Sequence, residues 1–201
     1  MTPDQLIDYV ARVESGGSYT AWTSNDNGAG ISFGLIQFNQ RKGSLPTLLQ
    51  RREAKDPPKF AQIFGGKKSV FLNERVFRQL HFQGDPWKSF FTQMGEYPPF
   101  QEVQRELAQD EYLEPARKLL HKHSLSSEKA LAMLFDLSIQ YGVTGAENKL
   151  QKAIEAVKEK TQNLTENEIL VKLAELSDTH DYDNQRRHRI LVDEKISSES
   201  A

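Results

Sequence analysis

The chain has 201 residues, a formal net charge of −2 at neutral pH and no cysteine. This length is enough to bury a full hydrophobic core, so we expect one domain over residues 1–201, either alone or as part of a longer protein. The near-neutral charge argues against nucleic-acid binding, and no stretch approaches the roughly 20 apolar residues of a membrane span. Without cysteine, neither a disulfide framework nor a thiolate zinc site can form.

The first element that the sequence predicts is a helix that ends beside an acidic residue. Thr2 and Gln5 have the spacing of a capping box, apolar residues follow at helical intervals, and glycines 16–17 should end the helix. Glu14 therefore lies in the last turn, where the negative end of the helix dipole and partial burial both disfavour a carboxylate. We expect a raised pKa for Glu14, which suits a general acid, although a lone Glu is more often a solvated surface residue.

Residues 24–40 predict a short and unusually polar hairpin. Residues 24–30 are rich in turn formers, residues 31–38 are β-prone, and Gly30 and Gly34 allow the backbone to turn tightly and approach a ligand. Five polar side chains fall in this stretch: Asp26, Asn27, Ser32, Gln37 and Asn39. A hairpin with a purely structural role rarely needs so many, so the hairpin and the preceding helix end form the candidate site.

A Glu that closes a helix, then an Asp, then Gly-x-Ser-x-Gly in a hairpin resembles the lysozyme superfamily, especially phage-type lysozymes and family 46 chitosanases. In the phage-type pattern the second carboxylate precedes a hydroxyl residue by six positions, which is the spacing from Asp26 to Ser32. The chitosanase pattern points to Asn27 instead, and the separation from Glu14 to Asp26 differs from both families. Because Asn cannot act as a base, we favour Asp26 as the second carboxylate, with Glu53 as a rival.

The rest of the chain predicts a helical scaffold. Helical patterns cover residues 44–52, 69–81, 85–94, 100–113, 130–141 and 146–160, and a capping box at Thr165 and Glu168 opens one more helix. Residues 130–141 are apolar nearly all round, so we expect them to be buried and to end at Gly142. We expect Asp136 inside this helix to be bonded to a neighbouring donor, and residues 52–68 to form an irregular excursion.

The back half of the chain also resembles family 46 chitosanases. The residues that carry this second resemblance are Tyr112, Pro115, Ala116, Asp136, Gln140 and Gly142. The basic run at residues 186–189 resembles the terminal helix of the same family, where an Arg pairs with acids. The resemblance therefore spans most of the chain.

Together these resemblances imply a mostly α-helical (α+β), lysozyme-like domain of two lobes, with a small β-hairpin beside the active-site cleft. They imply a glycoside hydrolase in which Glu14 is the acid, Asp26 is the base and Ser32 holds the attacking water. A helix end and a glycine-rich turn favour the wide carboxylate gap, roughly 6.5 to 9.5 Å, that an inverting mechanism needs. The residues expected to line the sugar subsites are Tyr19, Asn27, Gln37 and Asn39, and we expect no cofactor and no metal.

The preferred substrate is the glycan strand of peptidoglycan, because the spacing from Asp26 to Ser32 matches the muramidases and acids are few near the site. Chitosan, a polycation, is the alternative substrate. A different class of protein, a glycan-binding module without activity, is also compatible with the sequence.

The expected place of action is the bacterial cell wall, either in the periplasm of a target cell or outside the cell. The first residues show no basic region followed by an apolar run, so we expect no export signal of the usual kind. Lysis or contact-dependent injection of a toxin effector would serve instead, with an immunity or delivery protein as a partner. We expect a monomer that neither binds nucleic acid nor inserts into a membrane.

Overall fold

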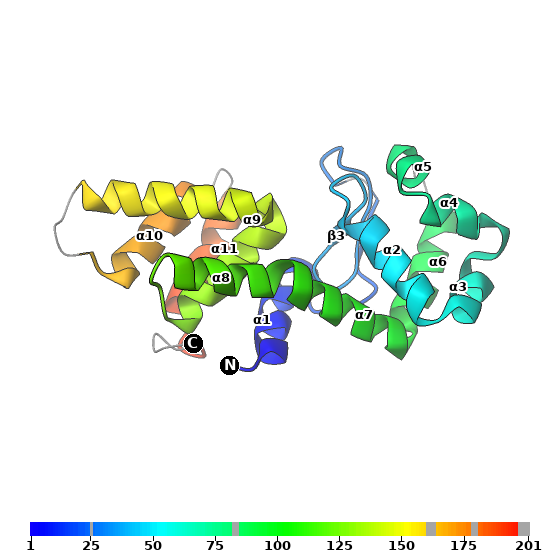
Figure 1. The fold of residues 1–201 in the computed structure, drawn as a ribbon, viewed down its shortest axis with the longest axis horizontal. Coiled ribbons are helices and arrows are strands. Elements are labelled where there is room, and N and C mark those ends of the chain that lie inside the picture. The colour runs from blue at the N-terminus through cyan, green and yellow to red at the C-terminus, as the bar shows by residue number, and fades with distance from the viewer. Residues whose placement is uncertain (25, 82–84, 160–163, 178–180, 197–201) are drawn as a thin grey trace. The chain divides into compact units, whose positions relative to one another are not determined.

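The computed structural model describes residues 1–24, 26–81, 85–159, 164–177 and 181–196 (Figure 1). The chain divides into two compact units: unit 1 is Met1–Val10 with Gln109–Ala201, and unit 2 is Ala11–Ala108. In the described part of the chain, helices dominate and one small antiparallel sheet is present, which confirms the predicted fold class. The prediction that residues 1–201 act as one domain stays a prediction.

Helix α1 (Pro3–Ser15) begins and ends where the sequence predicts. The Gln5 side chain accepts a hydrogen bond from the Thr2 backbone at 2.8 Å, and the Thr2 hydroxyl accepts one from the Gln5 backbone at 3.2 Å. At the other end, Gly16 and Gly17 have φ angles of 68° and 77°, and the Gly17 backbone nitrogen donates to the Ala11 carbonyl at 3.1 Å. This glycine-type cap fixes the position of the last helical turn.

The sheet of unit 2 has three very short strands: β1 (Trp22–Thr23), β2 (Ser32–Phe33) and β3 (Phe38–Asn39), in the order β1-β2-β3. The hairpin formed by β2 and β3 was predicted, whereas β1 was not, because two residues show no alternation of apolar and polar side chains. Thr23, Ser32 and Asn39 stand opposite one another across the sheet and therefore share one face. The other face carries aromatic side chains, with Phe33 and Phe38 fully buried.

Helices form the rest of unit 2: α2 (Ser44–Lys55), α3 (Pro57–Phe64), the 3₁₀ turn η1 (Gly65–Lys67), α4 (Lys68–Leu72), α5 (Glu74–Gln79), α6 (Asp85–Glu96) and α7 (Pro98–Ala108). The prediction of an irregular excursion over residues 52–68 is wrong. Side chains of Asp56 and Asn73 cap α3 and α5, accepting backbone hydrogen bonds at 3.0 and 3.1 Å. Helix α3, with 8 residues, is too short to show a clear periodic pattern in the sequence.

An aromatic core holds these short helices together. Phe64, Phe71 and Phe91 are fully buried, and the ring centroids of Phe64 and Phe71 lie 4.5 Å apart. The predicted apolar stripe of α6 joins this core, since Phe91 and Met94 are buried and Trp87 packs on Phe71 at 5.6 Å. Aromatic rings bury large areas, which compensates for the small number of residues in each helix.

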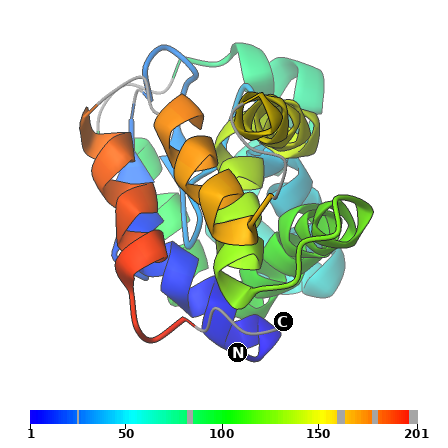
Figure 2. The same cartoon turned by 90° about the vertical axis from the view of Figure 1, so that its left-hand side faces the viewer.

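Unit 1 consists of helices: the π-helical turn η2 (Gln109–Leu113), α8 (Glu114–Lys122), α9 (Glu128–Lys158), α10 (Glu166–Ser177) and α11 (Asp181–Val192). Helices α8, α10 and α11 all pack against α9 (Figure 2). Residues 130–138 of α9 are buried without exception, and Gly142 interrupts the helix with φ 72° and ψ 164°, both as predicted. The predicted capping box also forms, with the Glu168 carboxylate 2.7 Å from the Thr165 hydroxyl.

Asp136 on α9 forms the buried polar contact that the sequence predicts. Its carboxylate lies 3.4 Å from the guanidinium of Arg187 on α11, and neither side chain is more than 1% exposed. Arg187 also donates a hydrogen bond to the Gln140 side chain. The basic run thus supplies an arginine that pairs with an acid inside unit 1.

Candidate active site in the hairpin of unit 2

Three of the predicted site residues form one hydrogen-bonded cluster. The Ser32 hydroxyl donates to Asp26 Oδ2 at 2.7 Å. The Asn39 amide nitrogen donates to the Ser32 oxygen at 2.9 Å and to Asp26 Oδ2 at 3.4 Å. Ser32 and Asn39 are buried, whereas Asp26 is half-buried. The cluster therefore presents one oriented carboxylate at the edge of a buried polar network.

Local backbone geometry brings Asp26 to the two strands. The Asp26 backbone nitrogen donates to the Gly30 carbonyl at 2.8 Å, and the Ala29 nitrogen donates to the Asp26 carbonyl at 2.7 Å. Asn27 and Gly28, with φ angles of 47° and 80°, complete this tight turn. Asn is one of the few residues with a side chain that tolerates such a left-handed conformation. Asn27, the residue after Asp26, is exposed.

Asn39 uses its whole side chain inside the protein. Its amide oxygen accepts hydrogen bonds from the backbone nitrogens of Arg41 and Lys42, both at 3.0 Å. Its amide nitrogen donates hydrogen bonds to Ser32 and Asp26. A side chain fixed at both ends cannot rotate freely, so Asn39 is suited to hold the carboxylate in place. The sequence predicted that Asn39 lines a sugar subsite and did not show this positioning role.

Two buried glutamines that the sequence analysis did not single out clamp the hairpin. Gln40 accepts a hydrogen bond from the Ile31 nitrogen at 3.0 Å and donates to the carbonyls of Phe77 and Leu80 at 2.6 and 2.9 Å. Gln104 of α7 accepts from the Leu35 nitrogen at 2.7 Å. It also donates to the Tyr19 carbonyl at 3.0 Å. Both side chains are fully buried, so the hairpin is anchored to α5 on one side and to α7 on the other.

The same glutamines explain two glycines of the Gly-x-Ser-x-Gly pattern. A Cβ atom on Gly30 would lie 2.2 Å from the Gln40 side-chain oxygen, and one on Gly34 would lie 2.1 Å from that of Gln104. Both glycines also have φ angles of 80°. Any other residue would therefore clash with the clamp and strain the backbone at once. The only hint in the sequence was the pair of glycines themselves, since no spacing rule links them to the glutamines.

Glu14 lies in the last turn of α1 and is half-buried. The next residue, Ser15, ties this turn to the hairpin: its hydroxyl donates to the Leu35 carbonyl at 2.6 Å and lies 3.1 Å from the Ala11 carbonyl. The helix end that carries Glu14 is therefore attached to the loop between β2 and β3.

Tyr19 and Gln37, both predicted to line subsites, lie in the same part of unit 2. The Tyr19 hydroxyl accepts a hydrogen bond from Arg105 of α7 at 2.6 Å, and the arginine also lies over the tyrosine ring at 5.8 Å. Gln37 has a left-handed backbone, with φ 56°. Its side chain accepts from the Thr23 hydroxyl at 3.1 Å. Thr23 and Arg105 thus join the site region without having been predicted.

Glu53, the rival second carboxylate, lies on α2. It forms an ion pair with Lys68 at 2.8 Å. This contact joins α2 to α4 and gives Glu53 a structural role.

The charges of the chain are divided unevenly between the units. Residues 11–108 contain 13 Lys and Arg against 9 Asp and Glu, whereas residues 1–10 and 109–201 contain 13 against 19. Unit 2, which carries the candidate site, therefore has an excess of positive charge. The small net charge of the whole chain conceals this division.

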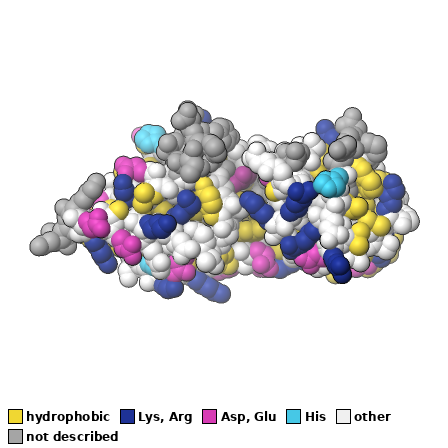
Figure 3. All heavy atoms as spheres, turned by 90° about the horizontal axis from the view of Figure 1, so that it is seen from above, with side chains coloured by type: hydrophobic (Ala, Val, Ile, Leu, Met, Phe, Trp, Pro, Cys, Tyr) yellow, Lys and Arg dark blue, Asp and Glu magenta, His cyan; other side chains and the backbone are white. Residues whose placement is uncertain are grey.

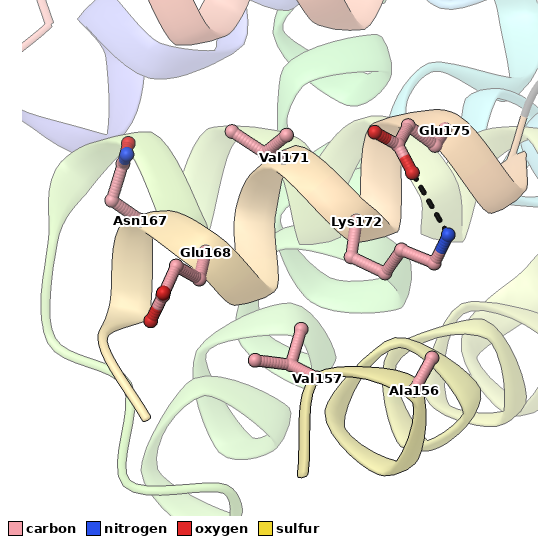
Figure 4. Close-up of a pocket in the computed structure, with 7 residues that line it drawn as sticks. All are labelled: Ala156, Val157, Asn167, Glu168, Val171, Lys172 and Glu175. Atoms are coloured by element: carbon pink, nitrogen blue, oxygen red, sulfur yellow. Dashed lines mark hydrogen bonds and ion pairs between the residues drawn. The ribbon is translucent and has the colours of Figure 1, made fainter. Parts of the chain in front are cut away.

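A pocket of about 330 Å³ in unit 1, between the end of α9 and α10, holds none of the predicted site residues (Figure 4). Its lining consists of Ala156, Val157, Asn167, Glu168, Val171, Lys172 and Glu175. Lys172 pairs with Glu175 at 2.8 Å, and the Thr165 hydroxyl and backbone lower the pKa of Glu168. Lys172, Glu175 and Glu168, the charged residues of the pocket, are thus engaged in helix contacts.

Within the described residues, no group of three or more His, Cys, Asp or Glu is placed to hold a metal ion. In the same part of the chain, no helix is long and apolar enough to cross a membrane.

Chitosanases are among the solved structures with a similar architecture. A family 46 chitosanase of Gynuella sunshinyii in complex with chitotetraose matches with a TM-score of 0.71 at 16% identity, covering 95% of this chain and 85% of that one. Native chitosanase from Bacillus subtilis MY002 matches with a TM-score of 0.69 at 14% identity, covering 94% of this chain and 84% of that one. These likenesses establish the lysozyme-like fold of the family 46 chitosanases. The resemblance to phage-type lysozymes stays a prediction.

The family is shown by a match over nearly the whole sequence. The model described as type VI secretion system spike protein VgrG3-like, C-terminal, matches residues 8–196. The chain belongs to this family. No curated protein sequence matches this chain.

Proposed function

We propose that the chain is an inverting glycoside hydrolase that cuts β-1,4-glycosidic bonds in the glycan strands of peptidoglycan. Glu14 protonates the leaving oxygen, Asp26 takes a proton from the attacking water, and Ser32 holds that water together with Asp26. Tyr19, Asn27 and Gln37 line the sugar subsites. The fold shared with chitosanases supports the reaction class.

The observation that carries the proposal is the Asp26–Ser32–Asn39 cluster. A general base must be held in one orientation, and Asp26 Oδ2 receives hydrogen bonds from both Ser32 and Asn39. The Ser32 oxygen donates to Asp26 and accepts from Asn39, which leaves one lone pair to accept a hydrogen from water. We therefore assign Asn39 to positioning the base rather than to contacting the sugar.

Inversion follows from the roles of the two carboxylates. Water must fit between the base and the sugar, on the face opposite the leaving group, so the carboxylates stand roughly 6.5 to 9.5 Å apart in inverting enzymes. Glu14 and Asp26 lie on separate elements, a helix end and a turn, which suits such a gap. In each turnover the acid gives one proton to the leaving oxygen and the base takes one from water.

Charge favours peptidoglycan over chitosan as the substrate. A polycationic chitosan chain calls for an acidic groove, whereas unit 2 carries more Lys and Arg than Asp and Glu. Peptidoglycan carries carboxylates, which an excess of positive charge attracts. Chitosanase activity is the second candidate, because the structures that share the fold are named as chitosanases.

Membership in a family of spike-protein C-termini supports delivery by a type VI secretion system. We propose that the chain reaches the periplasm of a target cell as a toxin effector. A producing cell would then need an immunity protein that blocks the site.

Side-by-side digestion of purified peptidoglycan and chitosan, with products resolved by mass spectrometry, tests the proposal. Muropeptides cleaved at the glycosidic bond are expected. Glucosamine oligomers would establish the chitosanase instead. Binding to either polymer without any new reducing ends would show a glycan-binding module that lacks the chemistry.

A further inference from the structure

Thr23 and Gln37 form a polar pair on the side of the sheet that carries the candidate site. Thr23 of β1 stands directly opposite Ser32 of β2, so the two side chains lie on the same face. The Cβ atoms of residues that stand opposite in this way are about 4.5–5.5 Å apart. Thr23 is exposed and Gln37 is half-buried, and the Thr23 hydroxyl lies 3.1 Å from the Gln37 side-chain oxygen. The pair is therefore open to a ligand and lies one strand away from Ser32.

Two contacts fix the orientation of the Gln37 side-chain amide. One end of the amide lies 3.2 Å from the Gly34 carbonyl, which can only accept a hydrogen bond, so this end must be the nitrogen. The other end is then the oxygen, and it must accept its hydrogen bond from the Thr23 hydroxyl. Thr23 and the Gly34 carbonyl together determine which way the amide points.

This arrangement leaves one hydrogen-bond donor of Gln37 available to a ligand. The amide nitrogen carries two hydrogens, and the Gly34 carbonyl takes one of them. In the described part of the chain, no protein group accepts the second hydrogen. The Thr23 hydroxyl cannot take over this role, because its only hydrogen is donated to the Gln37 oxygen. Toward a glycan, the pair thus presents a donor of fixed direction on Gln37.

The substituent on C2 of an amino sugar is the group that such a donor can distinguish. In N-acetylated glycans this substituent is an acetamido group, whose carbonyl oxygen accepts a hydrogen bond. In chitosan it is an ammonium group, which only donates and favours a carboxylate partner. A site built to hydrogen-bond one group discriminates against an analogue that lacks it. The Thr23–Gln37 pair carries no charge, and uncharged surface covers much of the part of unit 2 that carries the hairpin (Figure 3).

We propose that Gln37 donates a hydrogen bond to the acetamido carbonyl of the bound sugar, and that the Thr23–Gln37 pair selects N-acetylated glycans over chitosan. This inference rests on the proposed function, since it assumes that a glycan lies along the face of Ser32. C2 is the carbon next to C1, where water attacks, so a group that reads C2 belongs close to the residue that holds the water. Gln37 contacts the sugar, whereas Thr23 is a positioning residue that acts through Gln37.

Binding to one polymer in two chemical forms tests the pair without relying on hydrolysis. Insoluble peptidoglycan is compared with the same material after treatment with an N-deacetylase, which exchanges acetamido for amino groups, and with a sample that is acetylated again. All proteins are the full chain with Glu14→Gln, and the bound fraction is measured by sedimentation at physiological salt. The variants are Gln37→Met, Thr23→Val and Thr23→Ser. The matched control is Gln151→Met, at an exposed position of α9.

We expect the parent to bind the N-acetylated polymer roughly 3- to 10-fold more tightly than the deacetylated one, which is the range for one hydrogen bond. Acetylating the polymer again should restore the binding. Gln37→Met should abolish the preference, because it removes the donor and keeps a side chain of similar length. Thr23→Val should weaken the preference and Thr23→Ser should retain it, since only serine can still donate to Gln37. Gln151→Met should behave like the parent.

Three results would overturn the inference. The first is a parent that binds both polymers equally or binds neither. The second is Gln37→Met with the full preference of the parent. The third is an equal loss of affinity for both polymers in Gln37→Met, which would show a structural role instead. Failure of the chain with Glu14 intact to hydrolyse any glycan would remove the proposed function, whereas a preference that disappears in Gln37→Met would still establish the binding site.

Discussion

The two units of the chain are built in different ways. Unit 2 holds the hairpin through side-chain amides that bond to backbone groups, above all those of Asn39, Gln40 and Gln104. Unit 1 consists of helices packed against α9, with Asp136 and Arg187 as a buried ion pair. Unit 2 has an excess of basic residues, and unit 1 has an excess of acidic residues. Short strands and helices need specific polar contacts to fix a site, whereas a long apolar helix needs mainly a matching surface.

The largest expected effect is on the hydrolysis rate, when Glu14 at the end of α1 is replaced; the stability of the protein should not fall. Glu14→Gln should lower the hydrolysis rate by about 100-fold or more, because positioned acid catalysis typically contributes at least that much. The melting temperature should stay unchanged or rise, since a half-buried carboxylate is replaced by a neutral group of the same shape. Rate assays on peptidoglycan and thermal unfolding check this. Activity above about a tenth of the parent would remove Glu14 from the acid role.

The choice of base in unit 2 is tested by three matched substitutions. Asp26→Asn should be nearly as damaging as loss of the acid, whereas Asn27→Ala and Glu53→Gln should leave most of the activity. The reason is that only a carboxylate can take the water proton, and Glu53 is engaged with Lys68. If Asn27→Ala is the most damaging of the three, the register chosen for the hairpin is wrong. If Glu53→Gln alone abolishes activity, the base lies on α2.

In unit 1 the largest effect should be on stability. Asp136→Asn leaves the buried Arg187 without its carboxylate, which typically costs about 3–5 kcal/mol in the free energy of unfolding. Lys172→Ala removes an exposed ion pair with Glu175 and should change stability by no more than about 1 kcal/mol. Urea unfolding of both variants compares them directly. If Asp136→Asn and Lys172→Ala lower the free energy of unfolding by the same amount, the buried ion pair contributes no more than the surface pair.

The contact between Gln104 and the hairpin at Gly34 predicts a smaller effect on stability, and Gly16 provides a control. Gly34→Ala should destabilise the chain by about 1–3 kcal/mol more than Gly16→Ala, because the new Cβ meets the Gln104 oxygen while nothing lies within 4 Å of Gly16. Both glycines have positive φ angles, so the backbone strain is matched. Adding Gln104→Ala to Gly34→Ala should cost less than the sum of the two single changes. If the effects of the two changes simply add in this double-mutant cycle, the Gln104 side chain is not what makes Gly34→Ala destabilising.

The smallest predicted effect concerns pH and belongs to unit 1. Hydrogen bonds from Lys122 and then His123 lower the pKa of Glu147 below its ordinary value of 4.5. A lowered folded-state pKa stabilises the protein above the unfolded pKa, and this contribution is lost as the pH falls through the folded pKa. Glu147→Gln should therefore lower the melting temperature slightly at pH 7, and the difference from the parent should shrink as the pH falls below about 4.5. A difference between parent and variant that does not shrink at acidic pH would rule out this origin.

Sequence patterns predicted unit 1 better than unit 2 for physical reasons. The apolar stretch in α9, its end at Gly142 and the capping boxes at Thr2 and Thr165 are local features, and each appears as predicted. In unit 2 the sequence pointed to Asp26 and Ser32, whose spacing is local as well. The clamp by Gln104 was not predicted, because it joins residues 69 positions apart in the chain. The helix predicted over residues 69–81 is divided at Asn73 into the two short helices α4 and α5, a break that the helical pattern does not show.

The central claim is that Asp26 and Ser32 activate water for a single displacement at the sugar. Proton NMR of the first product released from a β-linked glycan tests this claim most directly, because it reports the configuration of the new reducing end before mutarotation. Inversion predicts that the α-anomer appears first. An initial β-anomer would mean retention, and it would contradict the roles given to Asp26 and Ser32 even if both residues proved essential.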